Sequence, residues 1–313
     1  MVRLDAIGYA IKRAGTSCFM IPDTYRLIDS LEAEAHALGM EVLLEIHSHH
    51  LQQLEIASRV DWVYDFALPP LVLHSLYSRD SRALGNWLRV RPNNAVTVLD
   101  THDGIGVIDV GIGREKEPGL LAPDELDRLV ETIHSRSDGQ SRLASGAAAS
   151  NLDLYQVNCT FYDAVGRRGE EYLVARAIQF FVPGIPQVYY VGLLAGTNDM
   201  ELLDRTKVGR DINRHYYTTS EVQEALENPV VRHLLDLIRL RNSHPSFAGQ
   251  VNIETPSNHA LIITWRLGAD WARLEVDFLE PRATVTYSKA SADTPEEKVI
   301  ERMDLCSASV PYS

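Results

Sequence analysis

Cysteine is scarce in this sequence, and its spacing excludes two structural devices. The three cysteines, Cys18, Cys159 and Cys306, lie far apart, are odd in number and form no C-x-x-C pair. A disulfide framework needs paired cysteines and a structural zinc site needs closely spaced ones, so neither is predicted. This usage is typical of a reducing compartment, and we predict a cytoplasmic location.

Long apolar runs and excess positive charge are also missing. The sequence has no apolar stretch of about 18 residues and no basic N-terminal segment followed by an apolar one and a cleavage site, so neither membrane insertion nor export is predicted. The 30 lysines and arginines are outnumbered by 43 aspartates and glutamates, which gives a net charge of −13. Because nucleic-acid binding depends on neutralising phosphates, a nucleic-acid partner is not predicted.

Two patterns that could hold a cofactor or a metal are incomplete. The glycine pairs 104–106 and 111–113 lack the third glycine and the helix start of a dinucleotide-binding fingerprint. His47, His49 and His50 cluster in the sequence, but no carboxylate follows at ligand spacing, so hydrogen-bonded histidines are favoured over metal ligands. We therefore predict no cofactor and no metal.

What the sequence does contain is an alternation of apolar strands and amphipathic helices. Such βαβα patterning predicts a parallel sheet with helical crossovers. From His244 on, short alternating runs predict antiparallel strands instead. The fold class is therefore α/β, the C-terminal part of a (β/α)8 TIM barrel with about five strand-helix units, followed by a small antiparallel β domain. The expected boundaries are 1–243 for the partial catalytic barrel and 244–313 for the β domain with its polar tail. The expected strands lie at about 2–8, 41–46, 61–66, 95–100 and 185–190. Expected helices include 22–38, 51–58, 168–181 and 219–241, and helical stretches are expected near 70–89.

Acidic residues lie at or just past the ends of three apolar runs. Asp5 follows Arg3-Leu4, Glu45 follows Val42-Leu43-Leu44, and Asp103 follows Val98-Leu99-Asp100-Thr101-His102. Since catalytic groups collect where the strands of a parallel sheet end, these acids are expected to meet there. Arg3 projects to the same side of a strand as Asp5 and is expected to keep that carboxylate ionised, whereas the apolar neighbours of Glu45 favour a protonated acid.

The order and spacing of these acids resemble the α-amylase-type glycoside hydrolase superfamily. Within it, the sequence is most similar to the sucrose phosphorylase family, and the likeness extends from residue 2 to about 290. The motifs that carry it are Arg3-Leu4-Asp5-Ala6-Ile7-Gly8-Tyr9, Gly15-Thr16-Ser17-Cys18-Phe19, Leu43-Leu44-Glu45-Ile46-His47-Ser48, Thr101-His102-Asp103-Gly104-Ile105-Gly106, Asn151-Leu152-Asp153-Leu154-Tyr155-Gln156-Val157-Asn158 and Gly209-Arg210-Asp211-Ile212-Asn213-Arg214-His215-Tyr216-Tyr217.

The resemblance implies a retaining phosphorylase that converts sucrose and phosphate to α-D-glucose 1-phosphate and fructose. Asp5 would form a β-glucosyl ester, Glu45 would protonate the departing fructose and then deprotonate phosphate, and Asp103 would stabilise the oxocarbenium-like transition state. Retention further predicts that the Asp5 and Glu45 carboxyl groups lie roughly 5 Å apart.

The same resemblance implies binding residues. Arg210 and His102 would bind glucosyl hydroxyls, Tyr9 would line the acceptor subsite, and His47 would lie on the phosphate side. Arg3 belongs to the same substrate-binding set, together with a loop that serves fructose and then phosphate and is formed by Asp153, Leu154, Tyr155 and Gln156. A homodimer is also implied.

One departure from the family leaves alternatives open. Relatives carry three strand-helix units and an inserted subdomain before the nucleophile strand, and the sequence is expected to lack them. A non-catalytic C-terminal fragment is therefore the competing hypothesis, and little or no activity is expected of the chain alone. Sucrose 6'-phosphate or another α-glucoside is the alternative substrate. Taken singly, Asp5 and Glu45 could also be strand-end or helix-capping acids.

Overall fold

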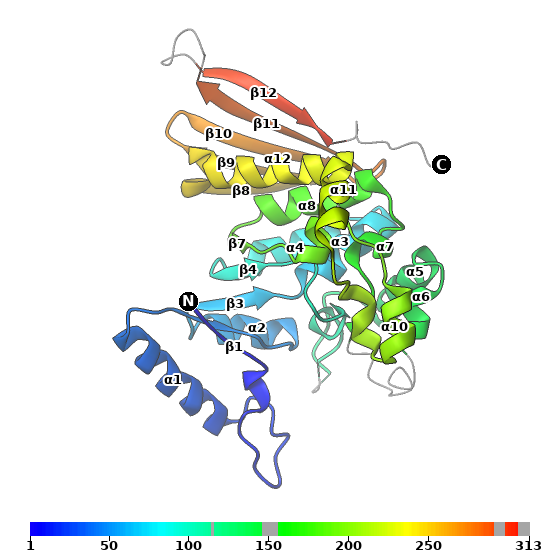
Figure 1. Cartoon of the computed structure of the whole chain (residues 1–313). Coiled ribbons are helices and arrows are strands. Elements are labelled where there is room, and N and C mark those ends of the chain that lie inside the picture. Colours follow the sequence, from blue (N-terminus) through cyan, green and yellow to red (C-terminus); the bar gives the residue numbers. More distant parts are fainter. Residues whose placement is uncertain (114–115, 146–155, 291–297, 306–313) are drawn as a thin grey trace.

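The described part of the chain contains two five-stranded sheets, a two-stranded sheet and the helices around them (Figure 1). The structure is a computed structural model and describes residues 1–113, 116–145, 156–290 and 298–305. The first sheet has the order β1-β2-β3-β4-β7, and each neighbouring pair is parallel. The second, β12-β11-β10-β9-β8, is antiparallel throughout. The predicted α/β class with a C-terminal antiparallel β domain is confirmed.

The parallel sheet brings all its strand ends to one edge. Its strands are β1 (Val2–Leu4), β2 (Val42–Leu44), β3 (Trp62–Asp65), β4 (Ala95–Thr97) and β7 (Ile185–Pro186). The first crossovers contain η1 (Ile7–Tyr9), α1 (Pro22–Ala37), α2 (His50–Ala57), α3 (Leu68–Ser78) and α4 (Arg82–Val90). Since Arg3 pairs with Leu43 and Leu43 with Trp62, the residues after β1 and β2 lie side by side.

A longer crossover separates β4 from β7. It contains β5 (Ile105–Gly106), η2 (Ile108–Val110), α5 (Pro123–Arg136), α6 (Gln140–Ser145), β6 (Gln156–Val157), α7 (Phe161–Ala164) and α8 (Gly169–Phe181). After β7 come α9 (Tyr190–Leu193), α10 (Met200–Thr206), η4 (Gly209–Asn213), α11 (Thr219–Glu227), α12 (Pro229–Ser243) and η5 (Pro245–Ala248). The antiparallel strands are β8 (Gln250–Ser257), β9 (Ala260–Leu267), β10 (Asp270–Asp277), β11 (Arg282–Ala290) and β12 (Lys298–Asp304).

Several elements differ from their predicted lengths; the helical region expected at 70–89 is two helices, α3 and α4, and the strand expected at 95–100 ends at Thr97. The strand expected at 2–8 stops at Leu4, and Ala6 adopts φ +45° before the 3-10 turn η1. The strand expected at 185–190 ends at Pro186, and Tyr190 begins α9. The helix expected at 219–241 is two helices, because Pro229 disfavours a helical conformation at Asn228, which instead caps α12.

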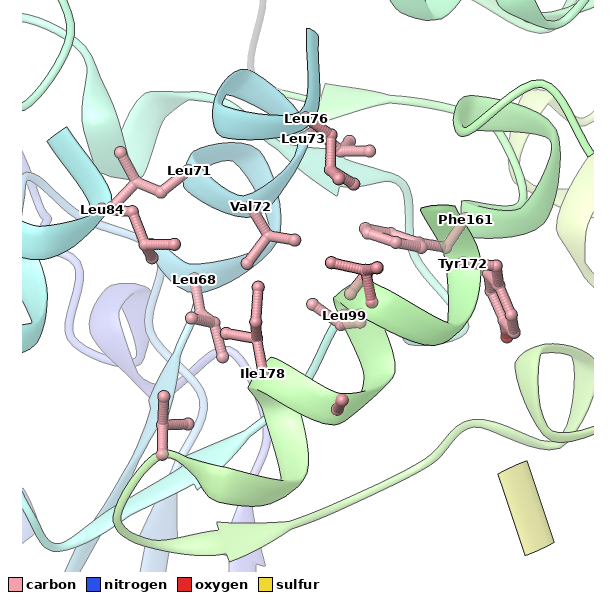
Figure 2. Packing of buried hydrophobic residues seen from close by; sticks show 14 of the residues in the cluster. Leu68, Leu71, Val72, Leu73, Leu76, Leu84, Leu99, Phe161, Tyr172 and Ile178 are labelled. Carbon is pink, nitrogen blue, oxygen red and sulfur yellow. The ribbon is translucent and has the colours of Figure 1, made fainter. Parts of the chain in front are cut away.

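The main hydrophobic core joins the helices to the C-terminal sheet. Figure 2 shows Leu68 and Val72 of α3 pointing toward Ile178 of α8, and all three side chains are fully buried. The same core continues into β9, where Trp265 Nε1 donates a hydrogen bond of 2.7 Å to the Phe181 carbonyl at the end of α8. The two parts therefore share one core, and the boundary placed between 243 and 244 stays a prediction.

Among the described residues, no helix has both the length and the apolar character needed to cross a membrane.

Candidate active site

Arg3 joins the two acids that follow β1 and β2. Its Nη1 lies 2.8 Å from Asp5 Oδ1, and its Nη2 lies 2.7 Å from Glu45 Oε2. The backbone N–H of Ala6 also donates to Glu45 Oε2 at 3.4 Å. One guanidinium thus fixes both carboxylates, and the parallel register of β1 and β2 sets their separation.

The pKa values of the two carboxyl groups are shifted in opposite directions. A hydrogen bond from Glu45, with the charge of Arg3, holds the pKa of Asp5 below its ordinary value. Burial and the hydrogen bond to Asp5 raise the pKa of Glu45 above its ordinary value, although Arg3 opposes this. Of the two, Asp5 is therefore the carboxyl group that loses its proton more readily. The separation of roughly 5 Å expected between the two carboxyl groups stays a prediction.

Asp103 lies beside Glu45 and is bound by two arginines. Donor atoms of Glu45, His102 and Asp103 all lie within 4.8 Å of one another. Arg210 Nη1 is 2.8 Å from Asp103 Oδ1, and Arg214 Nη2 is 3.4 Å from the same oxygen. The structure thus brings the three acids predicted from the sequence into one cluster.

The segment from η4 to Arg214 fixes the backbone around Asp103. Asn213 Nδ2 donates to the Asp103 carbonyl at 2.8 Å, and Arg214 Nε donates to the His102 carbonyl at 2.8 Å. Arg214 was not predicted as a site residue, although it lies in the same polar string as Arg210. Its Nη2 gives Asp103 a further ionic partner.

A cavity of about 290 Å³ opens beside the acids. Arg3, Glu45, Tyr64, Phe66, Thr101, His102 and Gln187 line it. Tyr64, Phe66 and Gln187 were missed, although they lie at the ends of β3 and β7, where the same strand-end rule applies. Tyr64 Oη donates to Gln187 Oε1 at 3.2 Å and so links the ends of these two strands.

Tyr9, His47, Gln156 and Arg210, which were predicted to bind substrate, lie outside that lining. The side chain of His47 is 8% exposed, and its Nδ1 is 2.9 Å from Asp109 Oδ2. Tyr9 is partly exposed on η1 and packs against Phe19 with ring centroids 4.8 Å apart. Both stay predictions as ligands of phosphate and acceptor.

The loop predicted to serve fructose and phosphate is only partly described. Asp153, Leu154 and Tyr155 lie outside the described residues. Gln156 begins β6, and its Oε1 accepts a hydrogen bond of 3.1 Å from the backbone N–H of Gly104. Gln156 is therefore adjacent to the residue that follows Asp103.

The carboxylates of the cluster are engaged by cations of the chain itself. Glu45, His102 and Asp103 are close enough to act as a metal-ligand set. Arg3 contacts Glu45 and Arg210 contacts Asp103, however, so guanidinium groups already balance these negative charges. Such a donor set favours binding of hydroxyl-rich or anionic groups over binding of a cation.

A buried ion pair supports the segment that leads to Asp103. Arg176 Nη2 of α8 lies 2.5 Å from Asp100 Oδ2, and both side chains are almost completely buried. Arg176 Nη1 also donates to Gln179 Oε1 at 2.8 Å. A Cβ at Gly192 would overlap Asp100 Oδ2, so the close approach of α9 requires glycine. This support was not predicted from the sequence.

Comparison with known proteins agrees with the motifs. No protein-family model matches the chain. It is 62% identical over 287 residues to the sucrose phosphorylase of Agrobacterium vitis, and the matched region covers 92% of this chain and 59% of that protein. It is 50% identical over 309 residues to the sucrose phosphorylase of Bifidobacterium adolescentis, covering 96% of this chain and 61% of that protein.

A solved structure is similar in the same way. The crystal structure of sucrose 6F-phosphate phosphorylase from Thermoanaerobacter thermosaccharolyticum matches with a TM-score of 0.83 and 38% identity, over 96% of this chain and 60% of that one. The chain thus spans about three-fifths of the length of these relatives. The resemblance found in the motifs is confirmed: the chain is related to the sucrose phosphorylase family over more than nine-tenths of its length.

Proposed function

We propose that the acid cluster belongs to a retaining α-glucosyl phosphorylase acting on sucrose. The observation that carries this proposal is the Arg3-bridged pair, in which the pKa of Asp5 is lowered and that of Glu45 is raised. A nucleophile must be ionised and a general acid must hold its proton. The lowered pKa of Asp5 therefore suits the nucleophile, and the raised pKa of Glu45 suits the general acid. The names and identities of the relatives support the same activity.

The proposed reaction has two displacements at the anomeric carbon. An Asp5 carboxylate oxygen attacks this carbon, the bond to the fructosyl oxygen breaks, and Glu45 donates its proton to that oxygen. A phosphate oxygen then attacks the same carbon and gives its proton to Glu45, and the ester bond to Asp5 breaks. Two inversions yield α-D-glucose 1-phosphate, and no cofactor takes part.

The neighbouring groups support this sequence of steps. Asp103, beside Glu45, offers negative charge to the oxocarbenium-like transition state. Arg210 and His102 are donors next to Asp103 that suit glucosyl hydroxyls. Tyr9 and the loop of Asp153, Leu154, Tyr155 and Gln156 remain the proposed acceptor subsite, and His47 the proposed phosphate-side residue.

A second candidate substrate is sucrose 6'-phosphate. The similar solved structure, at 38% identity, is named for that substrate. The higher identity of 62% to a sucrose phosphorylase favours unphosphorylated sucrose. A homodimer and a cytoplasmic location are part of the same proposal. The free thiols of Cys18 and Cys159 agree with a reducing compartment.

The experiment is phosphate-dependent release of glucose 1-phosphate from sucrose by the 313-residue chain, with Asp5→Ala as the matched variant. Little release is expected, as in the sequence analysis, and all of it should depend on Asp5. Equal release by the two proteins would remove Asp5 from its role. Release from sucrose 6'-phosphate that exceeds release from sucrose would favour the second candidate, and no release above a protein-free blank would favour the non-catalytic hypothesis.

A further inference from the structure

Asp109, which the proposed chemistry does not use, binds three donors from the segment after β2. It lies on η2 and is fully buried. Its Oδ1 accepts hydrogen bonds from Ser48 N at 3.0 Å and from Gln53 Nε2 at 2.7 Å. Its Oδ2 lies 2.9 Å from His47 Nδ1. Because a carboxylate oxygen accepts, this arrangement requires the proton of His47 to be on Nδ1.

The imidazole of His47 is held from two further sides. The ring of Phe66, at the end of β3, stacks on it with centroids 3.7 Å apart and an interplanar angle of 14°. On β5, a Cβ at Gly106 would lie 2.8 Å from Asp109 Oδ2 and 3.2 Å from His47 Nδ1. Only glycine allows this approach, so the position of the ring is determined by four different segments.

Negative charge surrounds this histidine. Burial alone would lower the pKa of His47, but the charge and hydrogen bond of Asp109 raise it above its ordinary value, and Glu45 and Asp103 add to the effect. These three acids act on the ring from its own segment, from the segment after β4 and from η2. The surrounding acids therefore favour the positive form of His47, at a place where an incoming anion needs a cation.

We propose that Asp109 is the positioning residue that fixes the His47 ring with a proton on Nδ1, and that this ring, when protonated, presents its positive charge beside the three acids. On the proposed function, the anion that meets this charge is phosphate, and the inference rests on that function for its purpose but not for its geometry. Asp109 touches neither substrate nor reacting atoms and acts through His47.

The test is an NMR titration of the histidine rings in the full chain and in Asp109→Asn. In the variant, the substituted amide side chain can keep its oxygen toward Ser48 N and Gln53 Nε2 and turn its NH2 group toward His47 Nδ1. An amide donor at this position requires an unprotonated Nδ1, so His47 should become a neutral Nε2–H tautomer with a lower titration midpoint.

A matched control exists on the surface. His36 Nε2 lies 2.7 Å from Asp61 Oδ2, and the same Asp61 oxygen accepts from Val42 N at 2.9 Å. Asp61→Asn should shift the titration of His36 and leave that of His47 unchanged. A variant that merely loosened the fold would not change the tautomer of one ring.

An unchanged His47 titration in Asp109→Asn overturns the inference. So does a 15N spectrum of the unsubstituted chain in which neutral His47 carries its proton on Nε2, a measurement that does not require the variant to fold. Failure of the proposed function gives a different result. His47 would then respond to Asp109→Asn as described, but inorganic phosphate would not perturb its resonances in the unsubstituted chain.

Discussion

Loss of the buried pair between Asp100 and Arg176 should strongly destabilise the chain. Arg176→Met replaces the guanidinium with an apolar side chain of similar length. It leaves Asp100 as a buried carboxylate without its cation. The Arg176 and Asp100 side chains are 0% and 6% exposed, so solvent cannot replace the lost partner. Removing one member of a buried pair costs about 3–5 kcal/mol. Gln179 also loses a hydrogen bond of 2.8 Å from Arg176, which places the expected loss near the upper end of that range.

Urea-induced unfolding, followed by far-ultraviolet circular dichroism, measures this loss. Arg239→Met is the matched control, because Arg239 pairs with Asp236 at 2.6 Å on the exposed face of α12. Exposed pairs contribute less than about 1 kcal/mol, so this variant should unfold nearly like the unsubstituted chain. Arg176→Met combined with Asp100→Asn should recover part of the loss, since no unpaired charge is buried. A loss in Arg176→Met no larger than that in Arg239→Met would refute the reasoning.

Three further predictions concern stability. First, hydrogen bonds to Asp199 and Glu221 raise the pKa of His215 in the folded chain, although burial opposes this. The free energy of unfolding should therefore fall as the pH rises above 6.5 and through this raised pKa, because the folded state then loses its extra proton. His215→Gln should lessen this fall in urea titrations at several pH values, and an unchanged profile would contradict it. Gly192→Ala should lower the thermal midpoint sharply, because its Cβ would overlap the buried ion pair just described; a wild-type midpoint would show that the helix moves at little cost. Asn228→Ala should cost about 1 kcal/mol of unfolding free energy through loss of the α12 cap, and Asn228→Ser, measured beside it, should retain most of that energy.

The strand-end rule located the acid cluster because parallel strands end at one edge. Asp5 and Glu45 follow β1 and β2, which pair directly, so a local apolar pattern was enough to bring them together. The position of Asp103 could not be inferred from the apolar pattern alone, since several residues separate it from the end of β4. The break at Pro229 was readable from the sequence, because the residue before a proline disfavours helix.

The supporting residues could not be inferred in the same way. Asp100 and Arg176 are 76 positions apart, and His47 and Asp109 are 62 apart. Each pair joins segments whose relative position depends on how α8 and η2 pack in the finished fold. No periodicity or local motif reports such a contact, and a buried arginine such as Arg176 looks in sequence like any other helix residue.

The account depends most directly on the division of labour between Asp5 and Glu45. Carbon-13 NMR of labelled carboxyl groups, assigned with Asp5→Asn and Glu45→Gln, measures both titrations in the chain without requiring turnover. The account predicts that Asp5 titrates below its ordinary pKa of 3.8 and Glu45 above its ordinary pKa of 4.5. Titration of both groups at their ordinary values, or in the reverse order, would contradict the assignment of nucleophile and acid.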